Sequence, residues 1–280
     1  MAPYALANSA TMNTGKATPT ENNHRSPANI GTCSLVGAGP GDPELLTLKA
    51  LKAIQAATVL LVDDLVSDAV LALAAPTARI VRVGKRGGCT STPQAFVEKL
   101  TLMAVRDGQT VVRLKGGDPL VFGRGGEELA HLQAAGIPVD VINGITAGFA
   151  AATSLGVPLT HRNHAHGVVF ITGHARPGDA ATDWKALAAA AHSARLTLVI
   201  YMGLSNAAHI QSELLHGLPA DTPAAVLQNV SLPDQRCACT TLGALHTTIE
   251  REQLASPCII VIGDVLQDLM QLPLPTALCA

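Results

Sequence analysis

Apolar and polar positions follow two different periods in the part of the chain that begins at Cys33. The stretch "CSLVGAG" is an apolar run that closes on glycine, which predicts a short buried strand followed by a turn. The next stretch, "LLTLKALKAIQAA", has helical spacing, and Asp42, Pro43 and Glu44 before it suit the cap and first turn of a helix. The pattern therefore predicts a strand, a glycine loop and a helix in this order.

The same alternation continues as far as Gly144. "TVLLVDDLV" predicts a second strand that ends in Asp63 and Asp64, and "RIVRVGK" and "TVVRLKGG" predict two more strands. "TPQAFVEKLTLMAVRDG" predicts a helix that ends at a glycine, and "EELAHLQAAGIPVDVING" predicts a helix, a turn and a strand. Alternating strands and helices favour a mostly parallel sheet with helices on both faces.

The residue pattern changes after Gly144. "GITAGFAAATSLGVPL" predicts a helix of small residues, and four strand-like stretches follow: "GVVFITGH", "LTLVIYMGL", "PAAVLQNVS" and "PCIIVIGDV". Helical segments separate most of them, so we expect a second α/β domain. The predicted organisation is a disordered N-terminal tail over 1–30, which is polar and has no apolar period, an α/β domain over 31–145 and another over 146–272.

Composition narrows the classes of function. The 280 residues carry a formal net charge of −2, which gives no general attraction to nucleic acid, and aromatic residues at 2% are too few for base-stacking surfaces. No apolar run approaches the roughly eighteen residues of a membrane span. The 6 cysteines are scattered without a CxxC pair, which fits a reduced compartment. We therefore expect a cytoplasmic protein with neither nucleic acid nor membrane as a partner.

The first glycine loop, in "VGAGPGDPE", leaves two kinds of ligand open. Asp63 follows it after about twenty residues at a strand end, which is the spacing of a dinucleotide-binding site. A Rossmann-type methyltransferase would show a similar loop and acid. Pro40 interrupts the glycines, and Asp42 places the start of the helix after the loop, which disfavours both interpretations. A nucleotide-binding or NAD-dependent protein nevertheless stays open on this loop alone.

The second glycine loop runs from Lys115 to Gly126 and makes a ligand site the favoured interpretation. Gly116 and Gly117 stand where a strand becomes a loop, and backbone without Cβ atoms can approach a ligand closely. Asp118 could accept hydrogen bonds from hydroxyl or ammonium groups of a ligand, and it would repel a phosphate. Both loops follow strands on the expected carboxyl edge of one sheet, where ligands of α/β proteins bind.

Five stretches occur in an order that resembles a known family. They are "VGAGPGDPELLTLKAL", "VRLKGGDPLVFGRGGEE", "GITAGFAAATSLGVPLTHR", "VIYMGL" and "DQR", and they extend roughly from Ser34 to Val265. In these the chain is similar to the uroporphyrinogen-III C-methyltransferases of the tetrapyrrole methylase family. The resemblance implies two α/β domains of tetrapyrrole methylase type with the cofactor cleft between them, usually in a homodimer.

The resemblance also implies an activity. Enzymes of this kind transfer methyl groups from S-adenosyl-L-methionine to two pyrrole carbons of uroporphyrinogen III and yield precorrin-2, which feeds sirohaem and cobalamin synthesis. A sibling precorrin methylase that acts on a later corrin intermediate is the alternative, because substrate preference can depend on loops. The block "RLKGGDP…FGRGGEE" favours uroporphyrinogen III.

The motif match assigns roles to individual residues. It implies that Asp63 is the proton acceptor and that Lys85 is the proton donor. The implied cofactor contacts are Pro40, Gly116, Gly117, Asp118, Val121, Thr146, Ala147, Met202 and Val230. At Val230 the family usually has Gly or Ala, so the larger side chain is expected to narrow the adenosine pocket. Asp64 is a second departure, because a neutral or basic residue is common there.

The implied substrate is a polycarboxylate, so a chain of net charge −2 must gather cations locally. The expected substrate contacts are Arg86, Lys115, Arg124, His161 and Arg162. The segment "HRNHAH" also has the spacing of metal ligands, but it reads as a loop before a strand without a nearby acid. We therefore expect no metal site.

Overall fold

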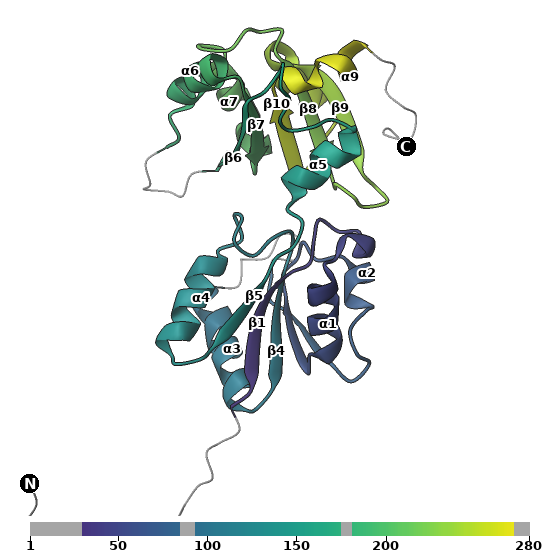
Figure 1. Ribbon diagram of the computed structural model, residues 1–280, viewed down its shortest axis with the longest axis vertical. Helices are drawn as coiled ribbons and strands as arrows, with labels where there is room; N and C mark the ends of the chain where they lie inside the picture. Colours follow the sequence, from purple (N-terminus) through teal and green to yellow (C-terminus); the bar gives the residue numbers. More distant parts are fainter. Residues whose placement is uncertain (1–29, 85–92, 175–180, 272–280) are drawn as a thin grey trace, which may run out of the picture.

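Two five-stranded sheets, one after the other along the chain, organise the protein (Figure 1). The computed structural model describes residues 30–84, 93–174 and 181–271. The predicted tail lies almost entirely outside the described residues, as do Lys85 and Arg86.

The first sheet has the strand order β3-β2-β4-β1-β5 and is parallel throughout, as the sequence predicts. Its strands are β1 (Thr32–Gly37), β2 (Val59–Val62), β3 (Arg79–Arg82), β4 (Thr110–Lys115) and β5 (Val139–Ile142). Helices α1 (Leu48–Ala56) and α2 (Asp68–Leu71) cover one face, and α3 (Gln94–Arg106) and α4 (Gly125–Ala134) cover the other (Figure 1). Two apolar clusters, one on each face, bury the strands.

The helix after the first glycine loop starts later than predicted. Asp42 caps a short 3-10 turn, η1 (Pro43–Leu45), by accepting a hydrogen bond from Glu44 N at 2.9 Å. Leu46 then takes an extended conformation, and the hydroxyl of Thr47 caps α1 at Ala50 N, 3.1 Å away. Helix α1 therefore begins after the second capping residue, Thr47, and not directly after the first, Asp42.

The second sheet has the order β6-β7-β10-β8-β9, and it is mixed because only β6 and β7 pair in parallel. Its strands are β6 (Gly167–Thr172), β7 (Leu196–Tyr201), β8 (Pro223–Gln228), β9 (Arg236–Thr241) and β10 (Cys258–Ile262). Strand β9 was not predicted, because "RCACTT" lacks a long apolar run and forms the edge of the sheet.

Helices surround the second sheet on both faces. They are α5 (Ala147–Leu155), α6 (Trp184–Ala194), α7 (Ala207–Leu214), α8 (Leu245–Arg251) and α9 (Gln267–Gln271), with short 3-10 turns η2 (Leu204–Asn206), η3 (Leu242–Ala244) and η4 (Asp264–Leu266). Helix α5 follows β5 directly and packs on the second sheet through Ala151 and Leu155. The chain therefore passes from one sheet to the other through this helix (Figure 1).

The carboxyl ends of several strands meet at the junction of the two halves. In the second sheet Tyr201 of β7 pairs with Ile259 of β10, which pairs with Leu227 of β8. The loops that follow β7 and β8 therefore leave the sheet at one common level. They face the loops after β1, β4 and β5 of the first sheet, so residues far apart in sequence are brought together there.

Candidate functional site

Backbone atoms of three loops touch at the carboxyl edge of the first sheet. Gly117 N donates a hydrogen bond to Gly39 O at 2.7 Å, and Gly39 N donates to Gly117 O at 3.2 Å. A Cβ atom placed on Gly37 would lie 2.5 Å from Gly144 N, and one on Gly144 would lie 2.2 Å from Gly117 O. The glycines after β1, β4 and β5 therefore allow an approach that no side chain would permit.

The carboxylate of Asp118 holds these loops together. Its Oδ1 accepts a hydrogen bond from Leu120 N at 2.8 Å, and its Oδ2 accepts from Asn143 Nδ2 at 3.2 Å and Gly144 N at 3.1 Å. The residue is 7% exposed. Protein donors reach both oxygens, and a hydrogen bond from a ligand to this carboxylate stays a prediction. The backbone of Asp118 remains part of the loop that faces the junction.

The start of α5 is tied to the end of β7. The hydroxyl of Tyr201 accepts a hydrogen bond from Gly148 N at 2.8 Å and lies 2.8 Å from Thr146 Oγ1. Burial raises the pKa of Tyr201, while the contacts with Thr146 and Gly148 partly offset this effect. Phe122 of the second glycine loop packs on the Tyr201 ring with centroids 4.8 Å apart. Thr146 and Ala147 are thereby fixed next to Gly117, whose added Cβ would lie 3.7 Å from Thr146 Cα.

The loop after β8 docks on the first glycine loop. Asp42 N donates a hydrogen bond to Ser231 Oγ at 3.1 Å, and a Cβ atom on Gly41 would lie 2.5 Å from Leu232 Cδ2. Pro40 is half-buried beside this contact. Val230 is 7% exposed and packs in the core of the second sheet, so its side chain points away from solvent.

Unusual backbone conformations gather around the junction. Of the 7 non-glycine residues with positive φ in the described part of the chain, five lie in these loops. They are Phe122, Arg124, Met202, Asn229 and Ser231. Such conformations cost about 1–3 kcal/mol each and persist where the surrounding contacts impose them, which is typical of functional sites.

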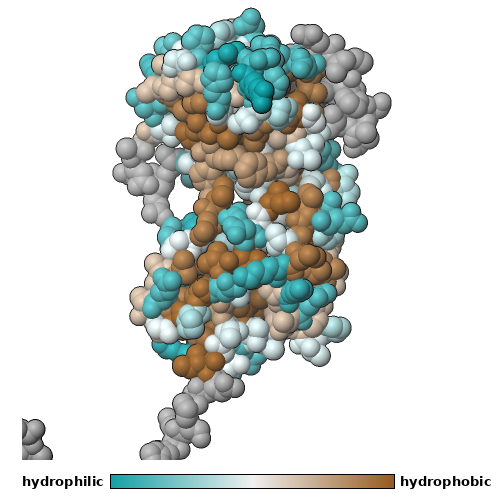
Figure 2. Space-filling model, in the orientation of Figure 1, coloured by the Kyte–Doolittle hydropathy of each residue, from teal (hydrophilic) through white to brown (hydrophobic). Residues whose placement is uncertain are grey.

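Large apolar side chains are exposed at the same junction. Met202 is 50% exposed, and the others are Leu65, Leu120, Phe122 and Phe149. Leu65 lies against the second glycine loop, since a Cβ atom on Gly116 would be 2.7 Å from Leu65 Cβ. Figure 2 shows hydrophobic surface on both sides of the junction. A junction with bare backbone on one side and apolar side chains on the other suits a large, partly apolar ligand.

A charged cluster lies behind the ends of β2 and β4. Arg113 Nη2 forms a short ion pair with Asp63 Oδ1, and Lys115 Nζ lies 3.5 Å from Asp63 Oδ2. Glu128 of α4 lies 3.2 Å from both cations. The Lys115 side chain is 3% exposed, so the prediction that it contacts the substrate is wrong: the face of β4 that carries it is covered by α4. Asp63 is 30% exposed at its side chain and remains accessible.

The remaining predicted substrate contacts do not all converge. Arg124 is 47% exposed at its side chain, stands in the position before α4 without a capping hydrogen bond, and pairs with Glu127 in the second glycine loop region. His161 and Arg162 belong to the segment before β6, which contacts the amino end of β7 through the hydrogen bond from His166 N to Arg195 O at 2.8 Å. Met202 follows the other end of that 6-residue strand, about 20 Å away. Within one chain His161 and Arg162 therefore lie towards the far end of the second sheet, and their contact with the substrate stays a prediction.

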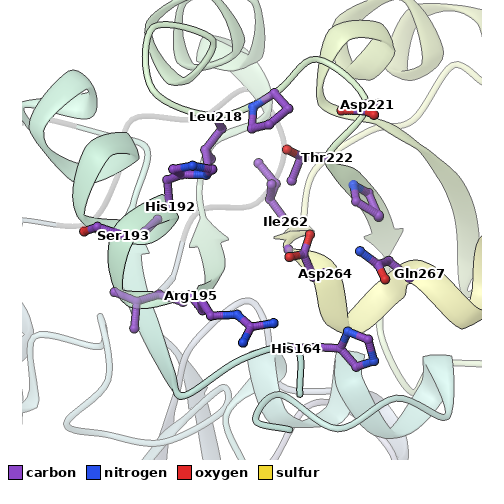
Figure 3. Close-up of a pocket in the computed structure, with 15 residues that line it drawn as sticks. His164, His192, Ser193, Arg195, Leu218, Asp221, Thr222, Ile262, Asp264 and Gln267 are labelled. Atoms are coloured by element: carbon purple, nitrogen blue, oxygen red, sulfur yellow. The ribbon is translucent and has the colours of Figure 1, made fainter. Parts of the chain in front are cut away.

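A separate hollow of about 610 Å³ lies at this far end of the second sheet (Figure 3). His164, His192, Arg195, Asp221 and Asp264 are among the residues that line it. Cations and acids are mixed around it. It contains none of the glycine-loop residues, so the junction between the sheets is the better candidate for chemistry.

Two further properties limit the kinds of site. In the described part of the chain no three residues among His, Cys, Asp and Glu are grouped as a metal ion would require. None of the described helices has the length and apolar character to cross a membrane.

Sequence reasoning missed several residues that build the junction. Tyr201, Phe122 and Ser231 make contacts across the two halves, and Glu128 completes the charged cluster. The glutamate followed a glycine loop and resembled an ordinary first-turn acid of a helix. One available signal was Tyr201, because the chain has 2 tyrosines and this one ends a buried strand.

Comparisons with known proteins agree in pointing to one family. The model described as Tetrapyrrole (Corrin/Porphyrin) Methylases matches residues 32–246. A uroporphyrinogen-III C-methyltransferase of Pseudomonas aeruginosa is 50% identical over 245 residues, which cover 87% of this chain and 98% of that protein. A chloroplastic S-adenosyl-L-methionine-dependent uroporphyrinogen III methyltransferase of Arabidopsis thaliana is 50% identical over 85% of this chain and 64% of its own length.

Solved structures give the same result. Uroporphyrin-III C-methyl transferase from Thermus thermophilus, in complex with S-adenyl homocysteine, aligns with a TM-score of 0.72 and 39% identity, over 85% of this chain and 94% of that chain. A cobalt precorrin-4 methyltransferase aligns with a TM-score of 0.75 and 27% identity, over 85% of this chain and 96% of that chain.

Proposed function

This chain belongs to the tetrapyrrole methylases, and we propose that it converts uroporphyrinogen III to precorrin-2 by two successive methylations. It is an S-adenosyl-L-methionine-dependent methyltransferase. The observation that carries the choice of substrate is the 50% identity to the Pseudomonas aeruginosa enzyme over 98% of that enzyme. The product would feed sirohaem synthesis, cobalamin synthesis or both.

The residues at the junction fit the methyl donor. Close backbone contacts at Gly117 and Gly144 leave a loop surface without side chains, next to the first turn of α5. We propose that the backbone of Gly116, Gly117 and Asp118 holds the polar end of the donor, together with Thr146 and Ala147. Pro40, Val121, Met202 and Val230 would enclose the rest. The side chain of Val230 is buried in the core of the second sheet, so we propose that it meets the donor through its backbone.

The proposed chemistry requires orientation and one proton acceptor. When bound, S-adenosyl-L-methionine supplies an electrophilic methyl group, which a pyrrole carbon must approach in line. The apolar side chains of Leu65, Phe122 and Met202 would hold the substrate face. Methylation leaves a proton that must be removed, and we propose that the partly exposed Asp63 carboxylate, which pairs with Arg113 and Lys115, accepts it.

Cations near the cleft would bind the carboxylates of the substrate. Arg124 is exposed beside the second glycine loop and fits this role. Lys85 and Arg86 are proposed as proton donor and substrate contact on the family resemblance, and they lie outside the described residues. The proposal further includes a homodimer that works in the cytoplasm, which sedimentation of the purified protein and fractionation of cells would test.

The decisive experiment is an anaerobic product assay with uroporphyrinogen III and S-adenosyl-L-methionine, followed by mass spectrometry and absorbance. We expect a product that has gained two methyl groups and whose absorbance spectrum differs from that of uroporphyrinogen III. Methylation of a later corrin intermediate, with uroporphyrinogen III left unchanged, would support the sibling methylase instead. Calorimetric binding of NAD without binding of S-adenosyl-homocysteine would contradict both.

A further inference from the structure

Glu128 lies at the inner side of the charged cluster behind the cleft. Its Oε1 accepts hydrogen bonds from Gln94 Nε2 at 2.9 Å, Arg113 Nε at 3.2 Å and Lys115 Nζ at 3.2 Å. The same two cations meet Asp63 on their other side. Two cations are thus shared between two carboxylates, one of which faces the cleft while the other faces α3 and α4.

Burial distinguishes the four members of the cluster. The side chains of Arg113, Lys115 and Glu128 are 4%, 3% and 4% exposed, whereas that of Asp63 is 30% exposed. A buried charge is costly unless it is paired, so removing one member leaves its partners uncompensated. The cluster has two charges of each sign, and Asp63 is the member through which it reaches the cleft.

We propose that Glu128 is a positioning residue for Asp63. Its negative charge holds the side chains of Arg113 and Lys115 beneath the strand ends. The two cations are therefore attracted to Glu128 as well as to Asp63. Asp63 is thereby held in a fixed orientation by two cations that also pair with Glu128. Glu128 acts on Asp63 through Arg113 and Lys115 and not by direct contact. The inference rests on the proposed function only where it assigns proton acceptance to Asp63.

The effect of removing the charge has a definite sign. Glu128→Gln keeps Oε1 as an acceptor and keeps the size of the side chain, but it deletes one negative charge. Arg113 and Lys115 would then direct their attraction to Asp63, so that this carboxylate holds its charge to lower pH. In the described part of the chain the charged groups facing Asp63 are these two cations from β4, with Asp64 next to it on its own loop.

The first measurement is the pH dependence of kcat/KM for uroporphyrinogen III. In Glu128→Gln we expect the acid limb to move to lower pH by on the order of one unit, and the maximal rate to fall about tenfold because a weaker base removes the proton more slowly. Glu128→Asp, which restores the charge on a shorter side chain, should move the limb part of the way back. A slower enzyme whose acid limb stays at the wild-type pH would assign Glu128 a merely structural role and overturn the proposal.

Glu98→Gln is the matched control. Glu98 of α3 is a part-buried carboxylate that lies 3.4 Å from His131 Nδ1, and it borders Arg113 and Glu128 in the same layer. Its partner is His131, whereas Glu128 binds the cations that hold Asp63. This variant should therefore lose a carboxylate charge from the same layer without displacing the acid limb. An equal displacement in both variants would mean that general charge, and not the shared cations, sets the titration.

A second measurement does not depend on activity. The carboxyl carbon of Asp63, assigned in ¹³C spectra by its loss in Asp63→Asn, can be titrated in the wild type and in Glu128→Gln. A midpoint at lower pH in the variant supports the coupling, and identical midpoints refute it. If the wild type leaves uroporphyrinogen III unmethylated while the midpoint still moves, the proposed substrate fails and the role of Glu128 stands.

Discussion

Asp118 Oδ2 accepts a hydrogen bond from Gly144 N at 3.1 Å, although 26 residues separate the two in sequence. The bond joins the loop after β4 to the loop after β5, and the other carboxylate oxygen accepts a hydrogen bond from Leu120 N within the first of these loops. The acid in the second glycine loop therefore holds together the loops of the proposed cofactor site.

Asp118→Asn should weaken the binding of S-adenosyl-homocysteine about tenfold or more. An amide at Oδ2 would point a donor at the N–H of Gly144, and an unsatisfied buried group costs about 1–3 kcal/mol. Titration calorimetry and thermal unfolding would both report the change, because affinity and stability depend on the same bonds. Asp140→Asn, at the exposed pair with Lys49, is the control and should leave the affinity unchanged. Normal affinity in Asp118→Asn would contradict the role given to this carboxylate.

Asp63→Asn should slow turnover by roughly a hundredfold or more while the affinity for S-adenosyl-homocysteine persists, since a general base contributes on this scale. Asp64→Asn should have a smaller effect. The Asp64 carboxylate lies towards β3, where a Cβ atom on Gly84 would meet its Oδ1 at 2.5 Å, and it forms no ion pair with Arg113 or Lys115 in the described residues. Steady-state rates of both variants check this. The reverse order of effects would make Asp64 the base.

Tyr201→Phe should lower the free energy of unfolding by about 1–3 kcal/mol, because Gly148 N and Thr146 Oγ1 lose their buried partner. The start of α5 should also become less fixed, which weakens cofactor binding. Thr153→Ala, which removes an exposed hydroxyl from the same helix, is expected to cost no more than about 0.5 kcal/mol. Denaturant unfolding compares the two. Equal losses would show that the tyrosine hydroxyl adds nothing specific.

The stability of the protein should fall at high pH through Cys33. Burial, with a smaller contribution from Glu128, raises the pKa of the Cys33 thiol to about 12. In the unfolded chain a thiol loses its proton from about pH 8.5 upward. The folded state therefore binds more protons between these values, and its stability decreases as pH rises, by up to about 1.4 kcal/mol per pH unit.

Replacing this thiol tests the sign. The variant Cys33→Ala loses packing at every pH, but its free energy of unfolding should fall less steeply than that of the wild type between pH 9 and 10.5. Val111→Ala, in the same apolar cluster, keeps the thiol and should retain the steep slope. Parallel curves for the wild type and Cys33→Ala would mean that the thiolate is tolerated in the core.

Residue patterns were enough to predict most of the strands and the loops that end them. Apolar runs closing on glycine located the ends of β1 and β4, and the alternation with helices determined the parallel order of the first half. The carboxyl ends of parallel strands meet at one edge whatever their distance in sequence, so the position of Asp63 near both glycine loops followed from pattern alone. Strand β9 was not predicted, because an edge strand needs no continuous apolar run.

Only the packing of distant segments showed which partners the polar side chains have. Arg113 and Lys115 point to one face of β4 by strand alternation, but only the packing of α4 showed that this face is covered and that Glu128 meets them there. His161 is near "GITA" in sequence. The helix between them leads away from the cleft, so the two segments are far apart in space. Sequence periodicity predicts which face of a strand or helix carries a side chain. Packing against distant segments decides whether that side chain contacts solvent, a ligand or another charge.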